Sequence, residues 1–80
     1  MSPKILRLPA VKDAIGDSRS TIYVRIAEGL FPKPIKLGPR ARGWPDNEIA
    51  ALNIARIAGK SDDEIRILVI KLHAARKEKP

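Results

Sequence analysis

After a short extended lead-in at residues 5–8, apolar residues recur at the spacing of a helix. Residues 9–15 carry them at positions i, i+1, i+4 and i+5, and Gly16 then supplies a residue that readily ends a helix. Residues 18–28 form a second such segment, whose first turn Asp17 or Ser18 can cap by accepting a hydrogen bond from a free N–H group. Two short helices joined by such a tight turn have the dimensions of a helix-turn-helix.

Between residues 30 and 44 the helical pattern stops, because prolines fall within this segment and proline cannot continue a helix. The apolar, polar, apolar order of Ile35, Lys36 and Leu37 is typical of a strand, and the segment that follows is rich in turn formers. We therefore expect a β-hairpin with strands near 34–37 and 42–45 and a basic tip.

Two further helices are expected in the second half of the chain. The first begins at a cap provided by Asp46 or Asn47 and ends before a glycine. The second begins at a capping box, in which the side chains of Ser61 and Glu64 satisfy each other's backbone N–H groups, and it runs to about Lys77.

These elements predict a mainly α fold, namely a small winged helix-turn-helix with a two-stranded β-hairpin wing and two C-terminal helices. We expect a single DNA-binding domain over residues 1–80, with the helix-turn-helix and wing in 5–45 and the C-terminal helices in 46–80. Trp44 follows the hairpin and should anchor it in the core. Tyr23 is expected to be partly buried.

The last helix has two apolar faces. The first face follows the i, i+3, i+4, i+7 rule and should pack on the core of the domain; its residues are Ile65, Leu68, Val69, Leu72 and Ala75. Ile67, Ile70 and Ala74 form a second stripe on nearly the opposite side. We interpret this stripe as a self-association surface, for a homodimer or for side-by-side units on repeated sites. The alternative is that the helix is wedged between the preceding helix and the helix-turn-helix.

Charge is unevenly distributed over the 80 residues, whose formal net charge is +7. Residues 1–43 carry nine basic and three acidic side chains, a net charge of +6, whereas residues 44–80 carry seven and six, a net charge of +1. An excess of positive charge suits a polyanionic partner. The predicted helix-turn-helix and wing therefore hold the charge that such a partner would bind.

Several kinds of chemistry have no support in the composition. The chain has no cysteine and one histidine, so we expect no disulfide, no metal site and no cofactor. His73 is expected on the surface. Since no nucleophile is set beside a base, we expect no catalytic residue, no small-molecule substrate and no enzymatic activity. The longest apolar run is far too short to span a membrane and no signal peptide is recognisable, so the expected location is the cytoplasm.

The outward face of the second helix suits the major groove of double-stranded DNA. Short hydroxyl side chains there can bind phosphate, and an arginine can read guanine through two hydrogen bonds. The basic hairpin that follows can reach phosphate or the minor groove beside it. The residues that we expect to bind DNA are Ser18, Arg19, Ser20, Thr21, Tyr23, Val24, Arg25, Lys33, Lys36, Arg40 and Arg42.

Three segments together resemble the AlpA family of prophage transcriptional regulators, which is similar to phage excisionases and to the MerR-type winged helix. They are residues 18–23 (Ser-Arg-Ser-Thr-Ile-Tyr), 28–38 apart from position 30, and 40–44 apart from position 42. The resemblance covers about residues 5–52. It implies a DNA-binding regulator carried by a prophage or integrative element.

The resemblance also assigns positions. Arg19, Ser20, Thr21 and Tyr23 match the family's recognition helix, Arg40 matches its wing arginine, and Trp44 matches the tryptophan that closes its wing. Two positions depart from the family. Val24 stands where a basic residue is usual, which puts base preference there in doubt, and Pro45 stands where a basic or polar residue is common.

We therefore expect a sequence-specific double-stranded DNA-binding protein that regulates transcription of a mobile element. One alternative is an excisionase, or recombination directionality factor, that bends attachment-site DNA. A more remote one is an RNA-binding or protein-interaction module. The chain has only three aromatic residues, and readers of single-stranded RNA usually stack bases on exposed aromatic side chains.

Overall fold

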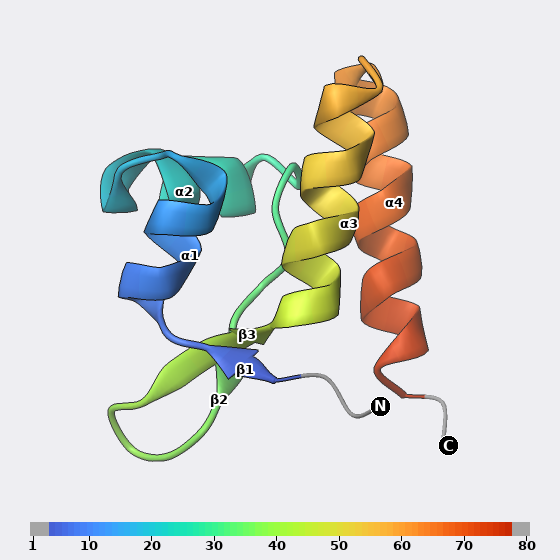
Figure 1. Ribbon diagram of the computed structural model, residues 1–80. Coiled ribbons are helices and arrows are strands. Elements are labelled where there is room, and N and C mark those ends of the chain that lie inside the picture. Colours follow the sequence, from blue (N-terminus) through green and yellow to red (C-terminus); the bar gives the residue numbers. More distant parts are fainter. Residues whose placement is uncertain (1–3, 78–80) are drawn as a thin grey trace.

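A computed structural model describes residues 4–77 as four helices and three short strands (Figure 1). The fold is mainly α, with the helix-turn-helix and wing predicted from the sequence. Residues 1–3 and 78–80 of the expected domain lie outside the described residues. In order, the elements are β1 (Ile5–Leu6), α1 (Leu8–Ile15), α2 (Arg19–Ala27), β2 (Ile35–Lys36), β3 (Arg42–Pro45), α3 (Asp46–Ile57) and α4 (Asp62–Ala75).

The wing is larger than the two-stranded hairpin that the sequence predicts. β2 and β3 form the expected hairpin, but β1 pairs with the other edge of β3, so the strand order is β1-β3-β2 and all pairs are antiparallel. Leu6 lies opposite Trp44. At the end of this pairing, the backbone N–H of Lys4 donates to Oδ1 of Asp46 over 3.1 Å, and the N–H of Asp46 donates to the carbonyl oxygen of Lys4 over 2.8 Å.

Gly43 allows β1 to approach β3 closely. A Cβ atom at this position would lie 2.5 Å from Cγ2 of Ile5 and 2.9 Å from the carbonyl oxygen of Leu6. The second neighbour is backbone and cannot move aside without breaking the strand pairing. The sequence requires glycine here for space, which the turn-like composition of the segment did not reveal.

The ends of the helices follow local sequence signals, with one exception. Ser18 caps α2 by accepting a hydrogen bond from the N–H of Thr21, and the capping box of Ser61 and Glu64 is complete. The cap predicted for α3 at Asp46 or Asn47 is wrong, because α3 has Pro45 at its N-cap and no side-chain cap. The Asp46 carboxylate binds the backbone of Lys4 instead.

The core forms where the sheet meets the helices, with Trp44 at its centre. Its side chain is 1% exposed, and its indole Nε1 donates to the carbonyl oxygen of Pro32 over 2.8 Å. The ring of Phe31 packs edge-on against it at 6.1 Å between ring centroids. The buried hydrophobic residues are Val11, Ile22, Leu30, Phe31, Trp44, Ile49, Leu52, Ile65 and Val69. As predicted, the stripe that starts at Ile65 faces this core, although Ala75 at its end is exposed.

α4 is tied to the loop between α2 and β2 by side-chain hydrogen bonds. Nε of Arg66 donates to the carbonyl oxygen of Glu28 over 2.9 Å, and Nη2 of Arg76 donates to that of Lys33 over 2.8 Å. Arg76 also forms a two-pronged ion pair with Glu48, an acid on α3 that is only 3% exposed. These contacts fix the two C-terminal helices against the rest of the domain.

His73 does not lie free on the surface as expected from the sequence. It is partly buried, and its Nε2 accepts a hydrogen bond from the backbone N–H of Lys33 over 3.0 Å. Burial lowers the pKa of His73, the nearby positive charges of Arg76 and Lys33 lower it further, and the carboxylate of Glu48 opposes the shift. The imidazole is therefore held in its neutral form, which is the form that can accept this bond.

Within residues 4–77, none of the helices combines the length and the apolar character that crossing a membrane requires.

Candidate nucleic-acid interface

α2 lies across the molecule with its first turn on the side that carries the wing (Figure 1). Ile22 on its inner face is fully buried, which fixes the helix on the core. Arg19 and Ser20 in its first turn and Val24 in its second are exposed. A helix anchored in this way presents short polar, basic and apolar side chains together, as base-reading helices do.

A cleft separates α2 from the wing, and four arginines line it. Arg19 comes from α2, Arg40 and Arg42 come from the wing, and Arg7 comes from the N-cap of α1. Between them, Tyr23, Trp44, Leu8 and Pro9 form a mainly apolar floor. We call this site the arginine cleft. It joins the predicted recognition helix to the predicted wing in one continuous surface.

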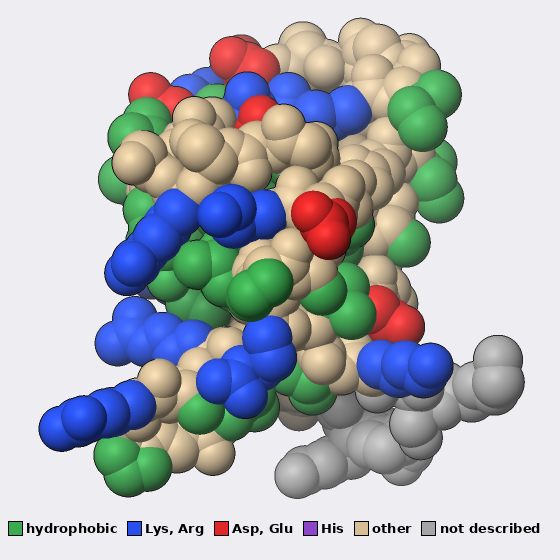
Figure 2. Space-filling view, turned by 60° about the vertical axis from the view of Figure 1, so that its left-hand side comes forward, with side chains coloured by type: hydrophobic (Ala, Val, Ile, Leu, Met, Phe, Trp, Pro, Cys, Tyr) green, Lys and Arg blue, Asp and Glu red, His purple; other side chains and the backbone are tan. Residues whose placement is uncertain are grey.

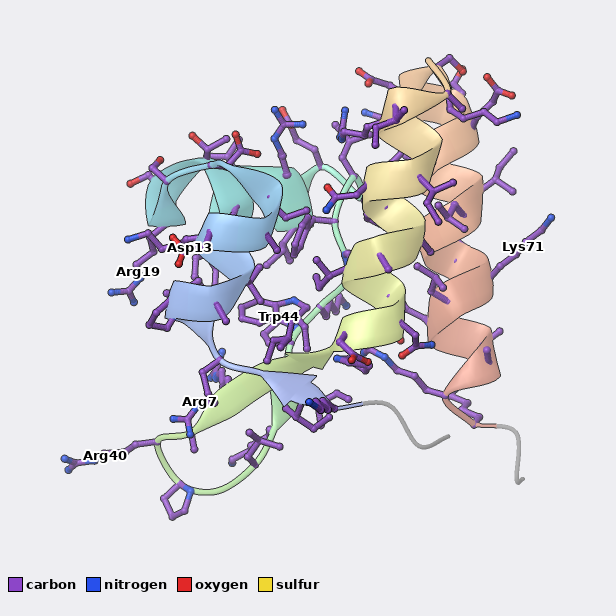
Figure 3. The ribbon with its side chains drawn as sticks, viewed as in Figure 1. Arg7, Asp13, Arg19, Arg40, Trp44 and Lys71 are labelled. Atoms are coloured by element: carbon purple, nitrogen blue, oxygen red, sulfur yellow. The ribbon has the colours of Figure 1, made fainter. Side chains whose placement is uncertain are left out.

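The figures show how the basic side chains gather on one side. In Figure 2, Lys and Arg side chains lie above and below a hollow in which hydrophobic side chains are visible. In Figure 3, Arg7, Arg19 and Arg40 all extend toward the same side of the molecule, away from Lys71 on α4. No acidic residue lines the cleft. The cleft is therefore a place of concentrated positive charge, as binding to a polyanion requires.

Tyr23 is half-buried, in agreement with the expected partial burial, and supports Arg19. The guanidinium carbon of Arg19 lies 5.6 Å from the centroid of the Tyr23 ring, which is a cation–π arrangement. Stacking limits the directions that the guanidinium can take. It leaves the N–H groups of Arg19 available at the mouth of the cleft.

On the other side of α2, a second shallow hollow is lined by Ser20, Thr21, Val24, Arg25 and Glu28. Arg56 of α3 and Asp62 of α4 close its far side. Ser20 and Arg19 also face a small hollow with Tyr23, so Ser20 lies between the two surfaces. The first turn of α2 is thus the part of the helix most open to a large ligand.

Two residues of α2 are less exposed than the helical wheel indicated. Nε of Arg25 lies 3.4 Å from Oδ2 of Asp17, and both side chains are about 70% covered. Thr21 is half-buried, and its hydroxyl accepts a hydrogen bond from the hydroxyl of Ser18 within the helix cap. Arg25 must exchange Asp17 for DNA if it is to contact a base.

The wing residues lie as predicted in the hairpin but differ in position. Arg40 is exposed in the loop at the tip, and Lys36 lies directly opposite Arg42 across the hairpin. Directly opposed residues project from the same face of a sheet, so Lys36 and Arg42 extend that face together. Of these three wing residues, Arg40 and Arg42 line the arginine cleft and Lys36 does not.

Lys33 is separate from this group. Its side chain is exposed, but both of its backbone polar groups bind α4, through His73 and Arg76. It does not line the arginine cleft. Eight of the eleven predicted DNA-binding residues thus line the hollows on the two sides of α2. Of the other three, Ser18 caps α2, Lys36 lies opposite Arg42 on the wing, and Lys33 lies at the junction with α4.

Arg7 is the cleft residue that sequence reasoning missed. Residues 5–8 were expected to be a simple extended lead-in, so no position was assigned to Arg7. Pairing of β1 with β3 brings it beside the wing. No local signal marks this pairing, because β1 is only two residues long.

In the part of the chain that the structure describes, no three His, Cys, Asp or Glu side chains lie close enough together to hold a metal ion. The surface offered by α2 and the wing is one of hydrogen-bond donors and positive charge.

The fold and the arginine cleft define the class, a winged helix-turn-helix with a basic cleft between its second helix and its wing. Residues 4–51, more than half of the chain, match the family described as "Prophage CP4-57 regulatory protein (AlpA)". The chain belongs to the AlpA family, which confirms the resemblance found in its sequence. The description of the family is that of a prophage regulatory protein.

The chain is also similar to a phage protein described as "Uncharacterized protein ORF88" of Enterobacteria phage P4. The two are 42% identical over 57 residues, which span 71% of this chain and 65% of the phage protein. No solved structure matches the chain.

Proposed function

We propose that this protein binds specific sequences in double-stranded DNA and thereby regulates transcription of a prophage or integrative element. The observation that carries the proposal is the arginine cleft, in which side chains of α2 and of the wing line one basic surface. Membership of the AlpA family supports the same proposal, because the family is described by a prophage regulatory protein. On this proposal the protein acts in the cytoplasm, where it binds the nucleoid.

In the proposed complex, the first turn of α2 enters the major groove. Arg19 and Ser20 are exposed there, and Val24 on the next turn can contact a thymine methyl group. Arg19 is the side chain best placed to form two hydrogen bonds with guanine, because Tyr23 supports it and no acid is paired with it within residues 4–77.

The wing and the start of α1 then hold the DNA backbone on one side of this helix. Arg40 and Arg42 supply positive charge for phosphate or for an adjacent minor groove. Arg7 precedes α1, whose N-cap has no side-chain hydrogen bond, so backbone N–H groups of its first turn add to the same positive region. These contacts fix the orientation of the protein and leave base reading to α2.

A footprint on the DNA that flanks the protein's own gene, recorded at two salt concentrations, tests the proposal. Binding that depends on sequence protects a bounded segment at both concentrations, whereas bulk electrostatic binding covers the DNA evenly and disappears at the higher one. A protected segment next to a promoter supports transcriptional regulation. Protection confined to an attachment site would instead assign the protein to excision, and even coverage would contradict sequence-specific binding.

A further inference from the structure

The pair of C-terminal helices carries exposed isoleucines on its outward side. Ile54 and Ile57 on α3 are 67% and 86% exposed, and Ile67 and Ile70 on α4 are 54% and 67% exposed. Ala74 is exposed as well, so the second apolar stripe predicted for α4 is not wedged inside the domain. Ile54 and Ile67 line one groove between the two helices, and exposed apolar side chains gathered on a small protein indicate a contact surface.

A groove between α3 and α4 runs beside this stripe. Three alanines and Ile54 form its α3 side, and Ile67 and Leu68 form its α4 side. Glu64 and Lys71, one helical turn before and one after these two apolar residues, lie at its α4 edge. Two helices with an apolar groove between them present half of a four-helix bundle.

The order of residues along α4 is complementary to itself in the reverse direction. Ile67, Ile70 and Ala74 are separated by three and then four residues, which is the spacing that defines the seam of a coiled coil. Glu64 and Lys71 flank one side of this seam, seven residues apart. In an antiparallel pair of such helices, the positions on that flank meet each other, so the acid of each copy faces the base of the other.

We propose that a second copy of this chain packs on the α3–α4 face, with its α4 antiparallel to the first. Ile67 then lies against Ile70 of the second copy, and Glu64 lies near Lys71 of the second copy. The twofold axis repeats both contacts. Ile54 and the alanines of α3 widen the apolar contact beyond what one short helix offers.

The charged side chains are available for this pairing. Lys71 forms no ion pair within residues 4–77. One carboxylate oxygen of Glu64 binds the backbone N–H of Ser61, and the other lies 3.8 Å from Nζ of Lys60 in a pair whose side chains are about half exposed. Such an exposed pair is weak, so Glu64 can turn its outer oxygen toward a second copy without losing the helix cap.

The dimer does not depend on the proposed DNA contacts. Lys71 points away from the side where Arg7, Arg19 and Arg40 lie (Figure 3), and the two surfaces share no residue. The arginine cleft of each copy therefore stays uncovered. Association can be measured on the full chain without DNA, so its failure would leave the proposed DNA binding untouched.

Sedimentation equilibrium of the wild type and three variants over a range of concentrations tests the proposal. The wild type should show a concentration-dependent dimer. In the Lys71→Glu variant, position 71 of each copy meets Glu64 of the other copy with a like charge, so the dimer contains this repulsion twice. Its dissociation constant should rise about tenfold. Adding Glu64→Gln to Lys71→Glu removes that repulsion while a residue compatible with the capping box remains, so association should recover in part.

Lys36→Glu is the matched control, because it changes the net charge equally from the wing, and its dissociation constant should equal that of the wild type. Circular dichroism establishes that each variant is folded. The proposal is overturned if the folded wild type is a monomer up to about 1 mM. It is equally overturned if Lys71→Glu and Lys36→Glu change association by the same factor, or if the double variant recovers nothing.

Discussion

The arginine side chains of this protein differ in the neighbouring residues that they contact. Arg19 rests on the ring of Tyr23 at the mouth of the arginine cleft, whereas Arg25 on the same helix is paired with Asp17. Arg76 is bound to the buried acid Glu48 and belongs to the framework of the domain. Residue type alone therefore does not define the DNA-binding set, because neighbours decide which guanidinium groups can meet a ligand.

Arg25→Ala should weaken binding to the specific site by about 1–3 kcal/mol, the usual value of a base contact, and weaken binding to random DNA less. The reason is that Arg25 can exchange its partly covered ion pair with Asp17 for a base that offers two acceptors. Fluorescence anisotropy with both DNAs at one salt concentration measures the difference. Equal losses on the two DNAs would show that Arg25 contacts only phosphate.

Stability should fall as the solution becomes acidic, through His73. Its pKa in the folded protein is lowered from 6.5 by burial first and then by Arg76, so folding favours the neutral form. This contribution is complete above the unfolded pKa and is lost as pH falls through the lower folded pKa. Thermal unfolding from about pH 7 to about pH 5 should show a steeper fall in Tm for the wild type than for His73→Gln. The glutamine keeps an acceptor for the N–H of Lys33, so parallel curves for the two proteins would exclude this role.

Among the elements, β3 connects the functional parts. It pairs with β2 to form the wing and with β1, which leads into α1, and it continues directly into α3. The wing is therefore tied to the helix-turn-helix through β1 and to the C-terminal helices through the end of β3. Because α1 begins directly after β1, this pairing also sets where Arg7 enters the arginine cleft.

Gly43→Ala should destabilise the domain by about 1–3 kcal/mol, because the added Cβ overlaps the backbone of Leu6 and the side chain of Ile5. DNA affinity should fall as well, since the substitution separates β1 from β3 and displaces Arg7. Gly38→Ala is the matched control, because a Cβ at that wing position meets nothing within 4 Å. Chemical denaturation compares the two, and an equally stable Gly43→Ala would refute the close approach of the strands.

Arg40→Ala combined with Arg42→Ala should lower DNA affinity and reduce the dependence of binding on salt. Each lost phosphate contact decreases the slope of log K against log salt by roughly 0.9. Both residues are exposed on the wing, so folding should be retained. Titrations at several salt concentrations give the slope, and an unchanged slope would mean that the wing does not touch DNA.

Local features could be read from the sequence, and long-range ones could not. The helix ends at Ser18, Ser61 and Gly16 depend on residues within one turn. Ser61 and Gly16 were predicted, and Ser18 was one of the two caps predicted for α2. β1 is two residues long and exists only because β3 lies beside it, so no periodic pattern marks it. In the same way, Glu48 is buried only because Arg76, 28 residues later, returns to meet it.

The whole molecule has two distinct surfaces. The side of the arginine cleft, with α2 and the wing, holds most of the predicted DNA-binding residues (Figure 2), while the α3–α4 face holds exposed isoleucines. The net charge of the first half of the chain is +6 and that of the second half is +1, so the sequence already separates the two. One surface suits a polyanion, and the other suits an apolar contact.

Ile67→Glu combined with Ile70→Glu should leave the protein folded, because both side chains are more than half exposed. The variant should remain a monomer where the wild type forms a dimer, and it should bind DNA that contains repeated sites without cooperativity. Light scattering measures the mass and a binding isotherm the cooperativity. Unfolding of the variant would place this stripe in the core instead.

The central claim is that α2 and the arginine cleft recognise a particular DNA sequence. The most direct measurement is the ratio of affinities for the footprinted segment and for a scrambled duplex of equal length, at one physiological salt concentration. The account predicts that the wild type prefers the footprinted segment by at least about 10³-fold, the lower end for specific DNA-binding proteins. It also predicts that Arg19→Ala removes most of that preference. Equal affinities for the two duplexes would contradict the account.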